Sequence, residues 1–491
     1  MKKPDTRSFV LCALLGASLV LPAVAIAQSD AESGFPGDAN PFVRKTRTDS
    51  LDAIFNPATL GETTLEFTVN EWNTLLGYYD RNPRNETEVS GTYTFAKDGR
   101  VWRFEQTGIR LRGNTSRRRP EGSEGQPHNP ASPAWHQAHF KADFEEMLGE
   151  DADRKMSGAM DGVILKWFKD DANHVREIYC YNLFRSFGVW TAPRAAYTSL
   201  SLKVGGASAR YGVYAMVEDI DKQFIKARKG DGLFKSDKGD LWKCTWASGD
   251  GAPLTGDSLY SVGVEEISLN EYESRRFNYD LKTNKGDLAA AAERLKAFVG
   301  ELEALQKKKP AEVKAWFEEH TDAELLIRTL AVNVACGMWD DYWSNKNNYY
   351  IYFDSDGKFY VLPYDYDNTL GVSLGNFGDA GTKNPLKWGP SSDRPLVNAL
   401  LSVPEYRDRY VACLKELADP KKDLFNADAS RKRIETWHRL IRGRIANDTD
   451  GLQALDDYPA DWGSTPFYRL LTGDDKTNFF RAKAKAIQKL K

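Results

Sequence analysis

The residue patterns typical of zinc proteins and nucleic-acid-binding proteins are missing from this sequence. It has 5 cysteines and 6 histidines in 491 residues. None of them form CxxC, HxxxH or HExxH spacings, which disfavours zinc knuckles and zinc hydrolases. The 67 Lys and Arg residues are balanced by 70 Asp and Glu, without a basic or acidic tail. Because nucleic-acid-binding proteins usually carry a basic surface, we expect no nucleic-acid partner.

Long apolar runs are also scarce, and the clearest one lies at the start of the chain. Lys2 and Lys3 precede an apolar run over residues 9–21, and Ala25-Ile26-Ala27 follows it. This pattern predicts a secretory signal peptide over residues 1–27. The run is shorter than a membrane helix, which needs about 20 residues, and no later run reaches that length. We therefore expect an exported protein (periplasm, cell surface or extracellular) with no transmembrane segment after signal cleavage.

The cysteines beyond the predicted signal peptide are Cys180, Cys244, Cys336 and Cys413. Export permits disulfides, and four cysteines allow three pairings. Cys180 and Cys336 lie in apolar helical contexts, where a cysteine also serves as a small buried apolar side chain. The sequence therefore leaves two alternatives open for these cysteines: one disulfide, or buried free thiols.

The composition that remains is globular, with 41% hydrophobic, 12% aromatic and 28% charged residues. Residues 28–60 are rich in Ser, Gly, Pro and Asp, which predicts a flexible leader. Periodicity then predicts strands within residues 63–119 and at 138–144, 198–204 and 211–218, with an exposed loop at 118–135. Helices are expected at 174–187 (capped by Asn173), 221–229, 286–307, 310–319 and 322–337, and through most of the last hundred residues. The polar stretch 236–285 is interpreted as an insertion or long excursion. The expected fold class is α+β, with a strand-rich first half and a helical second half.

One hairpin carries the most informative residues. Asp354-Ser355-Asp356-Gly357 lies between two aromatic and β-branched runs, which predicts a hairpin over residues 349–362. If Asp354 pairs with Gly357, Asp365 lies opposite Lys346, within an asparagine cluster. Asp340 precedes this cluster in the sequence and is expected at the same open end of the hairpin. Carboxylates and amides that converge in this way favour Mg²⁺ or Mn²⁺ over zinc.

Phosphoryl transfer uses such a set of residues: an aspartate that accepts the acceptor's proton, an asparagine and a second aspartate that hold metal. In protein kinases the asparagine follows the catalytic aspartate by five residues, and Asn345 follows Asp340 at this distance. The alternation of side chains along the predicted hairpin instead places Asn348 on the same face as Asp365, because residue 348 would pair with residue 363. We prefer Asn345 and keep Asn348 as the alternative.

The segment Trp339-Asp340 … Asn347-Asn348-Tyr349-Tyr350-Ile351-Tyr352 … Leu362-Pro363-Tyr364-Asp365-Tyr366-Asp367 resembles the signature of the CotH kinase family of secreted, spore-coat-protein-H-like kinases. Three other segments resemble that family in its order: Gly108–Arg117, Arg176-Glu177 opening a helix that ends at Phe187-Gly188, and Tyr211–Glu218. The resemblance implies an atypical, protein-kinase-like, two-lobed domain over residues 61–491, with a strand-rich lobe over 61–285 and a helical lobe over 286–491. It also implies ATP with Mg²⁺ or Mn²⁺, and a protein substrate with a Ser or Thr hydroxyl.

By the same resemblance, Asp340 matches the catalytic aspartate and Asp365 the metal-binding aspartate, although Tyr364 stands where the family usually has Trp. The lysine that contacts phosphate is Lys141 by preference, with Lys166 as its competitor. Glu177 is expected to pair with that lysine, although its position at a helix start also suits the helix dipole. The residues Arg112, Asn114 and Ser116, around Gly113, are candidates for a phosphate-binding turn, and a plain β-turn is the alternative. Glu218 is expected near the nucleotide.

Two other function classes remain open at this point. One is a non-catalytic exported coat, surface or carbohydrate-associated module that keeps the fold. The other is a hydrolase that uses Asp340 and Asp365 as an acid and base pair.

Overall fold

The computed structural model describes residues 49–491 apart from 150–152, 248, 375–376 and 459–467. The predicted signal peptide and most of the predicted leader therefore lie outside the described residues. No helix within the described ranges combines the length and the apolar composition that a membrane crossing requires. The structure contains both helices and two sheets, which confirms the α+β class.

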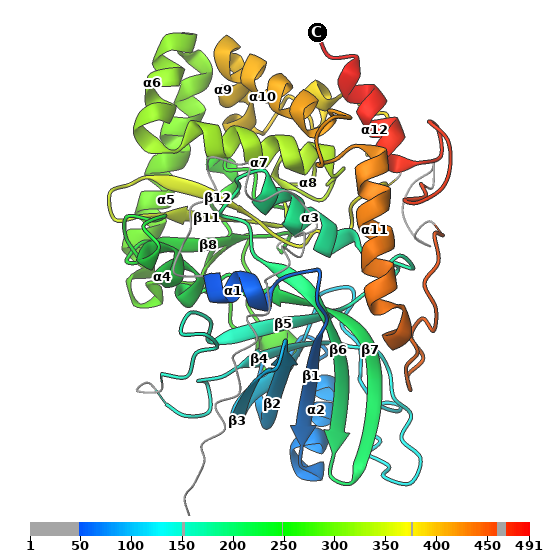
Figure 1. Ribbon diagram of the computed structural model, residues 1–491. Coiled ribbons are helices and arrows are strands. Elements are labelled where there is room, and N and C mark those ends of the chain that lie inside the picture. Colours follow the sequence, from blue (N-terminus) through cyan, green and yellow to red (C-terminus); the bar gives the residue numbers. More distant parts are fainter. Residues whose placement is uncertain (1–48, 150–152, 248, 375–376, 459–467) are drawn as a thin grey trace, which may run out of the picture. The chain divides into compact units, whose positions relative to one another are not determined.

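Seven strands of the first half close into a barrel in the order β1-β2-β3-β4-β5-β7-β6 (Figure 1). Most neighbours are antiparallel, and a parallel pairing of β1 with β6 closes the barrel. Closure gives every barrel strand a hydrogen-bonded neighbour on both sides. The strands are β1 (Gly61–Phe67), β2 (Val89–Lys97), β3 (Arg100–Arg112), β4 (His139–Asp143), β5 (Gly162–Trp167), β6 (Ala195–Val204) and β7 (Ala207–Glu218).

Side chains alternate between the inside and the outside of this barrel. Phe140 and Leu165 belong to the apolar core that fills it. Because successive strand residues point to opposite faces, their neighbours His139, Lys141 and Lys166 lie on the outer face. The alternation therefore places a set of polar and cationic side chains outside the barrel, where the second half of the chain meets it.

Two elements around the barrel differ from the sequence expectation. Residues 69–81 form helix α2 (Val69–Arg81), which begins at the Thr68 cap and buries Trp72, Leu75 and Leu76. The expectation of a mostly strand pattern over residues 63–119 is therefore wrong for this stretch. Helix α1 (Asp49–Ile54) buries Leu51 and Ile54 in the barrel core.

A second sheet contains the predicted hairpin, in the order β12-β11-β8-β10-β9. Its strands are β8 (Asp240–Cys244), β9 (Val262–Gly263), β10 (Tyr279–Leu281), β11 (Tyr349–Phe353) and β12 (Phe359–Pro363). The interpretation of residues 236–285 as an excursion is wrong, because this stretch supplies three strands and β8 pairs with β11. The sheet thus takes strands from both sides of the predicted lobe boundary at 285–286.

The hairpin register is one residue away from the predicted one. Phe353 pairs with Phe359 and Tyr349 with Pro363, whereas the prediction paired Asp354 with Gly357. The loop is longer because the Asp354 carboxylate accepts hydrogen bonds from the backbone N–H groups of Asp356 (3.0 Å) and Lys358 (2.9 Å). The expected position of Asp365 opposite Lys346 is therefore wrong, since a shift of one residue moves side chains to the other face.

The helices of the second half are found close to their predicted ranges, and α7 (Ala323–Ala335) packs against β12 (Figure 1). Helix α3 (Arg176–Ser186) begins later than predicted, and its first N–H groups bind the carboxylate of Asp171 rather than Asn173. The four described cysteines are buried free thiols. The loop at 118–135 is only partly exposed, because Arg119, Glu121, His128 and Trp135 are buried.

The helices after α2 are α3 (Arg176–Ser186), α4 (Lys222–Gly230), α5 (Leu288–Ala304), α6 (Pro310–His320), α7 (Ala323–Ala335), α8 (Tyr342–Asn345), α9 (Pro395–Ser402), α10 (Pro404–Leu417), α11 (Ala427–Ile441) and α12 (Phe479–Gln488). Short 3₁₀ turns lie at Gly256–Ser258, Glu271–Glu273, Lys285–Asp287, Leu305–Lys307, Pro385–Lys387 and Arg442–Arg444.

Candidate functional site

A buried lysine on the outer face of the barrel is surrounded by three carboxylates. The Nζ atom of Lys166, on β5, lies 2.7 Å from Glu177, 2.6 Å from Asp365 and 3.4 Å from Asp367. Only 6% of the Lys166 side chain is exposed. Glu177 comes from the first turn of α3, and both aspartates follow the end of β12, so this contact joins three separate parts of the chain.

Of the two candidate lysines, only Lys166 forms the expected pair with Glu177. Lys141 lies on the neighbouring strand β4 and pairs with Asp219 at 3.0 Å. The preference for Lys141 therefore gives way to Lys166 in the function proposed below. The difference arises because Lys141 is opposite Ile164, two residues before Lys166 on β5.

The charges of this cluster favour the ionised forms of Lys166 and Asp365. Burial disfavours the Lys166 ammonium, but Asp365, Asp367 and Glu177 outweigh it and raise the Lys166 pKa well above the usual value. Burial likewise opposes ionisation of Asp365, but Lys166 and Arg112 lower its pKa. Burial raises the pKa of Glu177 in spite of the lysine.

Asp365 is held in an unusual backbone conformation directly after the hairpin. Its φ of +62° lies in the left-handed region, which is uncommon for residues other than glycine. Its backbone N–H donates to the Tyr181 hydroxyl at 2.9 Å, and the guanidinium of Arg112 donates to the Tyr364 hydroxyl at 2.6 Å. The loop is thus tied both to helix α3 and to the barrel strand β3.

Asp340 accepts hydrogen bonds from three asparagine side chains. The amide nitrogens of Asn345, Asn347 and Asn348 lie 2.5, 3.0 and 2.9 Å from its carboxylate. Burial raises the pKa of Asp340, the asparagine bonds oppose this, and the charge of Asp365 raises it further. Both predicted asparagines, Asn345 and Asn348, therefore position Asp340, and the geometry does not separate them.

The residue after Asp340 connects the two aspartate loops. Asp341 begins helix α8 and accepts from the Ser344 N–H at 2.7 Å and from the Asn333 amide. Asn333 in turn accepts from the Tyr366 hydroxyl at 2.7 Å, and Tyr366 stands between Asp365 and Asp367. Burial raises the pKa of Asp341 to about 7. This buried chain of hydrogen bonds fixes the Asp340 segment relative to the Asp365 segment.

The carboxylates fit a metal ion that is shared with a phosphate ligand. No group of three or more His, Cys, Asp or Glu side chains in the described part of the chain is arranged as a complete metal site. Mg²⁺ in phosphoryl-transfer sites, however, is usually held by one or two carboxylates together with substrate phosphates and water. Asp365 supplies one carboxylate, and the Oδ1 atom of Asp367 is buried and has no hydrogen-bond partner among the described residues.

The remaining predicted residues fall into two groups. Arg112 contacts the Asp365 loop, and the turn after it continues through Gly113, with exposed Asn114 and half-buried Ser116. The contacts of Glu218 are not with the Lys166 cluster. Its carboxylate binds Arg228 at 2.9 Å and Arg194 at 3.3 Å. These two arginines explain the buried charge of Glu218 without a contact to a nucleotide.

Asp367 was not singled out in the sequence analysis, although it lies two residues after Asp365. The alternation of Asp365, Tyr366 and Asp367 is a signal that could have identified it. The sequence also contains Gly371-Val372-Ser373-Leu374-Gly375, which has the spacing of a hydrolase nucleophile. The hydroxyl of Ser373 is buried and donates to the Gly378 carbonyl at 2.8 Å, so it is not presented as a nucleophile.

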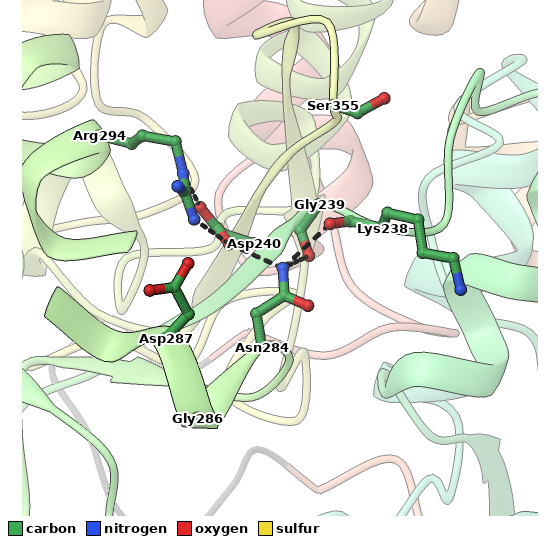
Figure 2. Close-up of a pocket in the computed structure, with 8 residues that line it drawn as sticks. All are labelled: Lys238, Gly239, Asp240, Asn284, Gly286, Asp287, Arg294 and Ser355. Atoms are coloured by element: carbon green, nitrogen blue, oxygen red, sulfur yellow. Dashed lines mark hydrogen bonds and ion pairs between the residues drawn. The ribbon is translucent and has the colours of Figure 1, made fainter. Parts of the chain in front are cut away.

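A separate pocket of about 590 Å³ lies beside β8 (Figure 2). The eight described residues that line it include none of the predicted site residues. Its buried carboxylate, Asp240, already binds Arg294 at 2.6 and 2.9 Å and Asn284 at 2.9 Å. The Lys166 cluster is therefore the better candidate site.

Comparison with known proteins agrees with the sequence resemblance. A comparison with curated proteins finds no match. The model of the family described as CotH kinase protein matches residues 109–471, which include every predicted site residue. The chain therefore belongs to the CotH kinase protein family.

Proposed function

We propose that this chain is an exported, ATP-dependent protein kinase, which transfers the γ-phosphate to Ser or Thr hydroxyls of secreted or surface proteins with the help of Mg²⁺ or Mn²⁺. The observation that carries the proposal is the Lys166 contact with Glu177 and Asp365. A lysine fixed by a helix glutamate beside a metal-binding aspartate is the arrangement that protein kinases use to hold nucleotide phosphates.

In this proposal the two halves of the chain have the roles of kinase lobes. The barrel carries Lys166 and Arg112, which neutralise phosphate charge. The hairpin and the helices after it carry Asp340, Asp365 and Asp367. The nucleotide lies where these side chains meet, on the outer face of β3 to β5.

The proposed roles follow from the environment of each side chain. Asp340 orients the acceptor hydroxyl and accepts its proton, and its raised pKa makes it a stronger base than an exposed aspartate. The three asparagines keep its carboxylate in one orientation. Glu177 keeps Lys166 at the phosphate position, because its carboxylate holds the ammonium at 2.7 Å.

Asp365 and Asp367 are the residues that would hold the metal ion. When it is bound, the ion supplies positive charge to the β- and γ-phosphates. Because Asp365 now binds Lys166 directly, we expect metal and nucleotide to bind together, with phosphate oxygens taking the place of part of the Lys166 contact.

Transfer of labelled γ-phosphate from ATP, to the protein itself and to casein, tests this function with Mg²⁺ or Mn²⁺ present. Three forms are compared: wild type, Asp340→Asn and Asp356→Asn, a control at the exposed tip of the hairpin. We expect transfer to Ser or Thr with wild type and the control, and its loss in Asp340→Asn. Absence of transfer from folded wild type, together with no metal-dependent ATP binding, would instead support a non-catalytic module.

A further inference from the structure

Three polar side chains form a row across adjacent barrel strands. Arg112 on β3 pairs directly with His139 on β4. Phe140 pairs with Leu165 on β5, so His139 is opposite Lys166 when the ladder is continued by one residue. Side chains of directly opposed residues share a face of the sheet. His139 therefore lies between Arg112 and Lys166, two residues of the proposed phosphate site.

The hydrogen-bond partner of His139 fixes where its proton lies. The backbone N–H of Trp167 donates to the Nδ1 atom of His139 at 3.0 Å, so Nδ1 carries no hydrogen in the neutral ring. The hydrogen is then on Nε2. This atom is buried and has no partner among the described residues, in a histidine that is only 2% exposed.

Cationic side chains have the largest charge effects on His139. Burial and the positive charges of Lys166, Arg112, Lys169 and Arg117 lower the pKa of His139 well below its usual value. The ring is therefore neutral, and it is a hydrogen-bond donor beside Arg112 and Lys166, both of which also contact the Asp365 loop. The indole Nε1 of Trp167 is a second buried donor without a partner in the described part of the chain, and its ring lies 5.9 Å from that of His139.

The turn after β3 passes directly beside the imidazole. A Cβ atom placed on Gly113 would lie 3.3 Å from Cδ2 of His139 and 2.8 Å from Oγ of Ser116. The φ of Gly113 is +112°, which favours glycine at this position. The glycine thus allows the turn to approach the ring edge that includes Nε2.

We propose that Nε2–H of His139 donates a hydrogen bond to a phosphate oxygen of the bound nucleotide, between Arg112 and Lys166. This inference rests on the proposed function, and it adds a neutral donor to the cationic phosphate contacts. The ligand class is a nucleoside polyphosphate, recognised here through its phosphates and not through its base.

Calorimetric binding of ATP and of adenosine, each with Mg²⁺, tests the inference in three variants. His139→Asn keeps an acceptor for the Trp167 N–H but has no donor at the Nε2 position, whereas His139→Gln offers an amide donor there. His136→Asn is the control, since His136 lies at the surface and contacts Asp450. We expect His139→Asn to bind ATP about 10- to 100-fold more weakly, with His139→Gln close to wild type and adenosine affinity unchanged.

Equal ATP affinity in wild type and His139→Asn would overturn the inference and leave the proposed function intact. An equal loss of ATP and adenosine affinity would also overturn it, because it would show a general effect on the fold or on base binding. Failure of folded wild type to bind ATP would instead refute the proposed function.

A measurement on the unaltered chain covers the case in which His139→Asn does not fold. With ¹⁵N-labelled histidine, the Nε2–H resonance of His139 should shift on addition of Mg²⁺ and ATP and remain in place with adenosine. No shift in a sample that is saturated with ATP would contradict the proposal.

Discussion

Replacement of Lys166 by methionine should destabilise the protein strongly, and more so at high pH. The substitution keeps the length and the apolar part of the side chain but removes the charge. Lys166 and Glu177 have side chains that are 6% and 5% exposed, and loss of one partner of such a buried pair costs about 3–5 kcal/mol. We therefore expect the free energy of unfolding to fall by about this amount at pH 8.

The pH dependence follows from the carboxylates that remain. Even with Lys166 present, burial and the charges of Asp365 and Glu177 raise the pKa of Asp367 to about 7. Without the lysine, the pKa values of Glu177 and Asp365 in the folded state rise above their unfolded values. The folded variant then binds more protons than the unfolded chain, so its stability increases as the pH falls. The loss should be smaller at pH 5.5 than at pH 8.

Urea denaturation monitored by tryptophan fluorescence at both pH values measures these differences. Lys235→Met is a matched control, because Lys235 contacts Asp356 in an exposed pair, and such pairs contribute about 0–1 kcal/mol. A Lys166→Met loss as small as that of the control, or a loss that grows as the pH falls, would refute the assignment of Lys166 as the charge centre of the site.

Further substitutions distinguish residues that affect ATP binding from residues that affect only stability. Glu218→Gln should lower stability by about 3–5 kcal/mol without changing ATP affinity, and calorimetry together with urea denaturation checks both. Because two arginines lower the Glu218 pKa to about 2 against burial, its contribution is present above the ordinary Glu pKa of about 4.3 and is lost as the pH falls toward 2. In an acid titration of stability, the wild type should therefore lose more than Glu218→Gln over this window. Gly113→Ala should weaken ATP binding and lower the thermal midpoint, since the added methyl group meets Ser116 in a turn with positive φ; unchanged ATP affinity would contradict the role of that turn. Lys141→Met should retain ATP binding, and its loss would restore Lys141 as the phosphate lysine.

Local patterns predicted much of this fold. Alternation identified most barrel strands, and helical spacing identified α5, α6 and α7, because these elements bury one face or one stripe. Helix α2 was missed even though Trp72, Leu75 and Leu76 have helical spacing, since the surrounding strands dominate that region. The strands within residues 236–285 are short, and β9 spans only Val262–Gly263. The pairing of β8 with the hairpin strand β11 therefore has no local signal.

The candidate site likewise has some features with a local sequence signal and some without one. The spacing of Asp340 and Asn345 and the position of Asp365 after the hairpin are readable from the sequence. The identity of the lysine is not, because the partners of Lys166 lie 11 and 199 residues away along the chain. The register of the hairpin depends on the Asp354 carboxylate, which binds two N–H groups of its own loop and lengthens it. Such side-chain contacts shift a register without changing the apolar pattern.

The proposed function depends above all on metal-dependent binding of ATP at the Asp365 loop. Calorimetry with ATP should be carried out with Mg²⁺ and with EDTA, on wild type, Asp365→Asn and the exposed control Asp356→Asn. We expect binding by wild type and the control that requires Mg²⁺ and disappears in Asp365→Asn. Binding by Asp365→Asn that equals wild type, or ATP binding by wild type that is unaffected by EDTA, would contradict it.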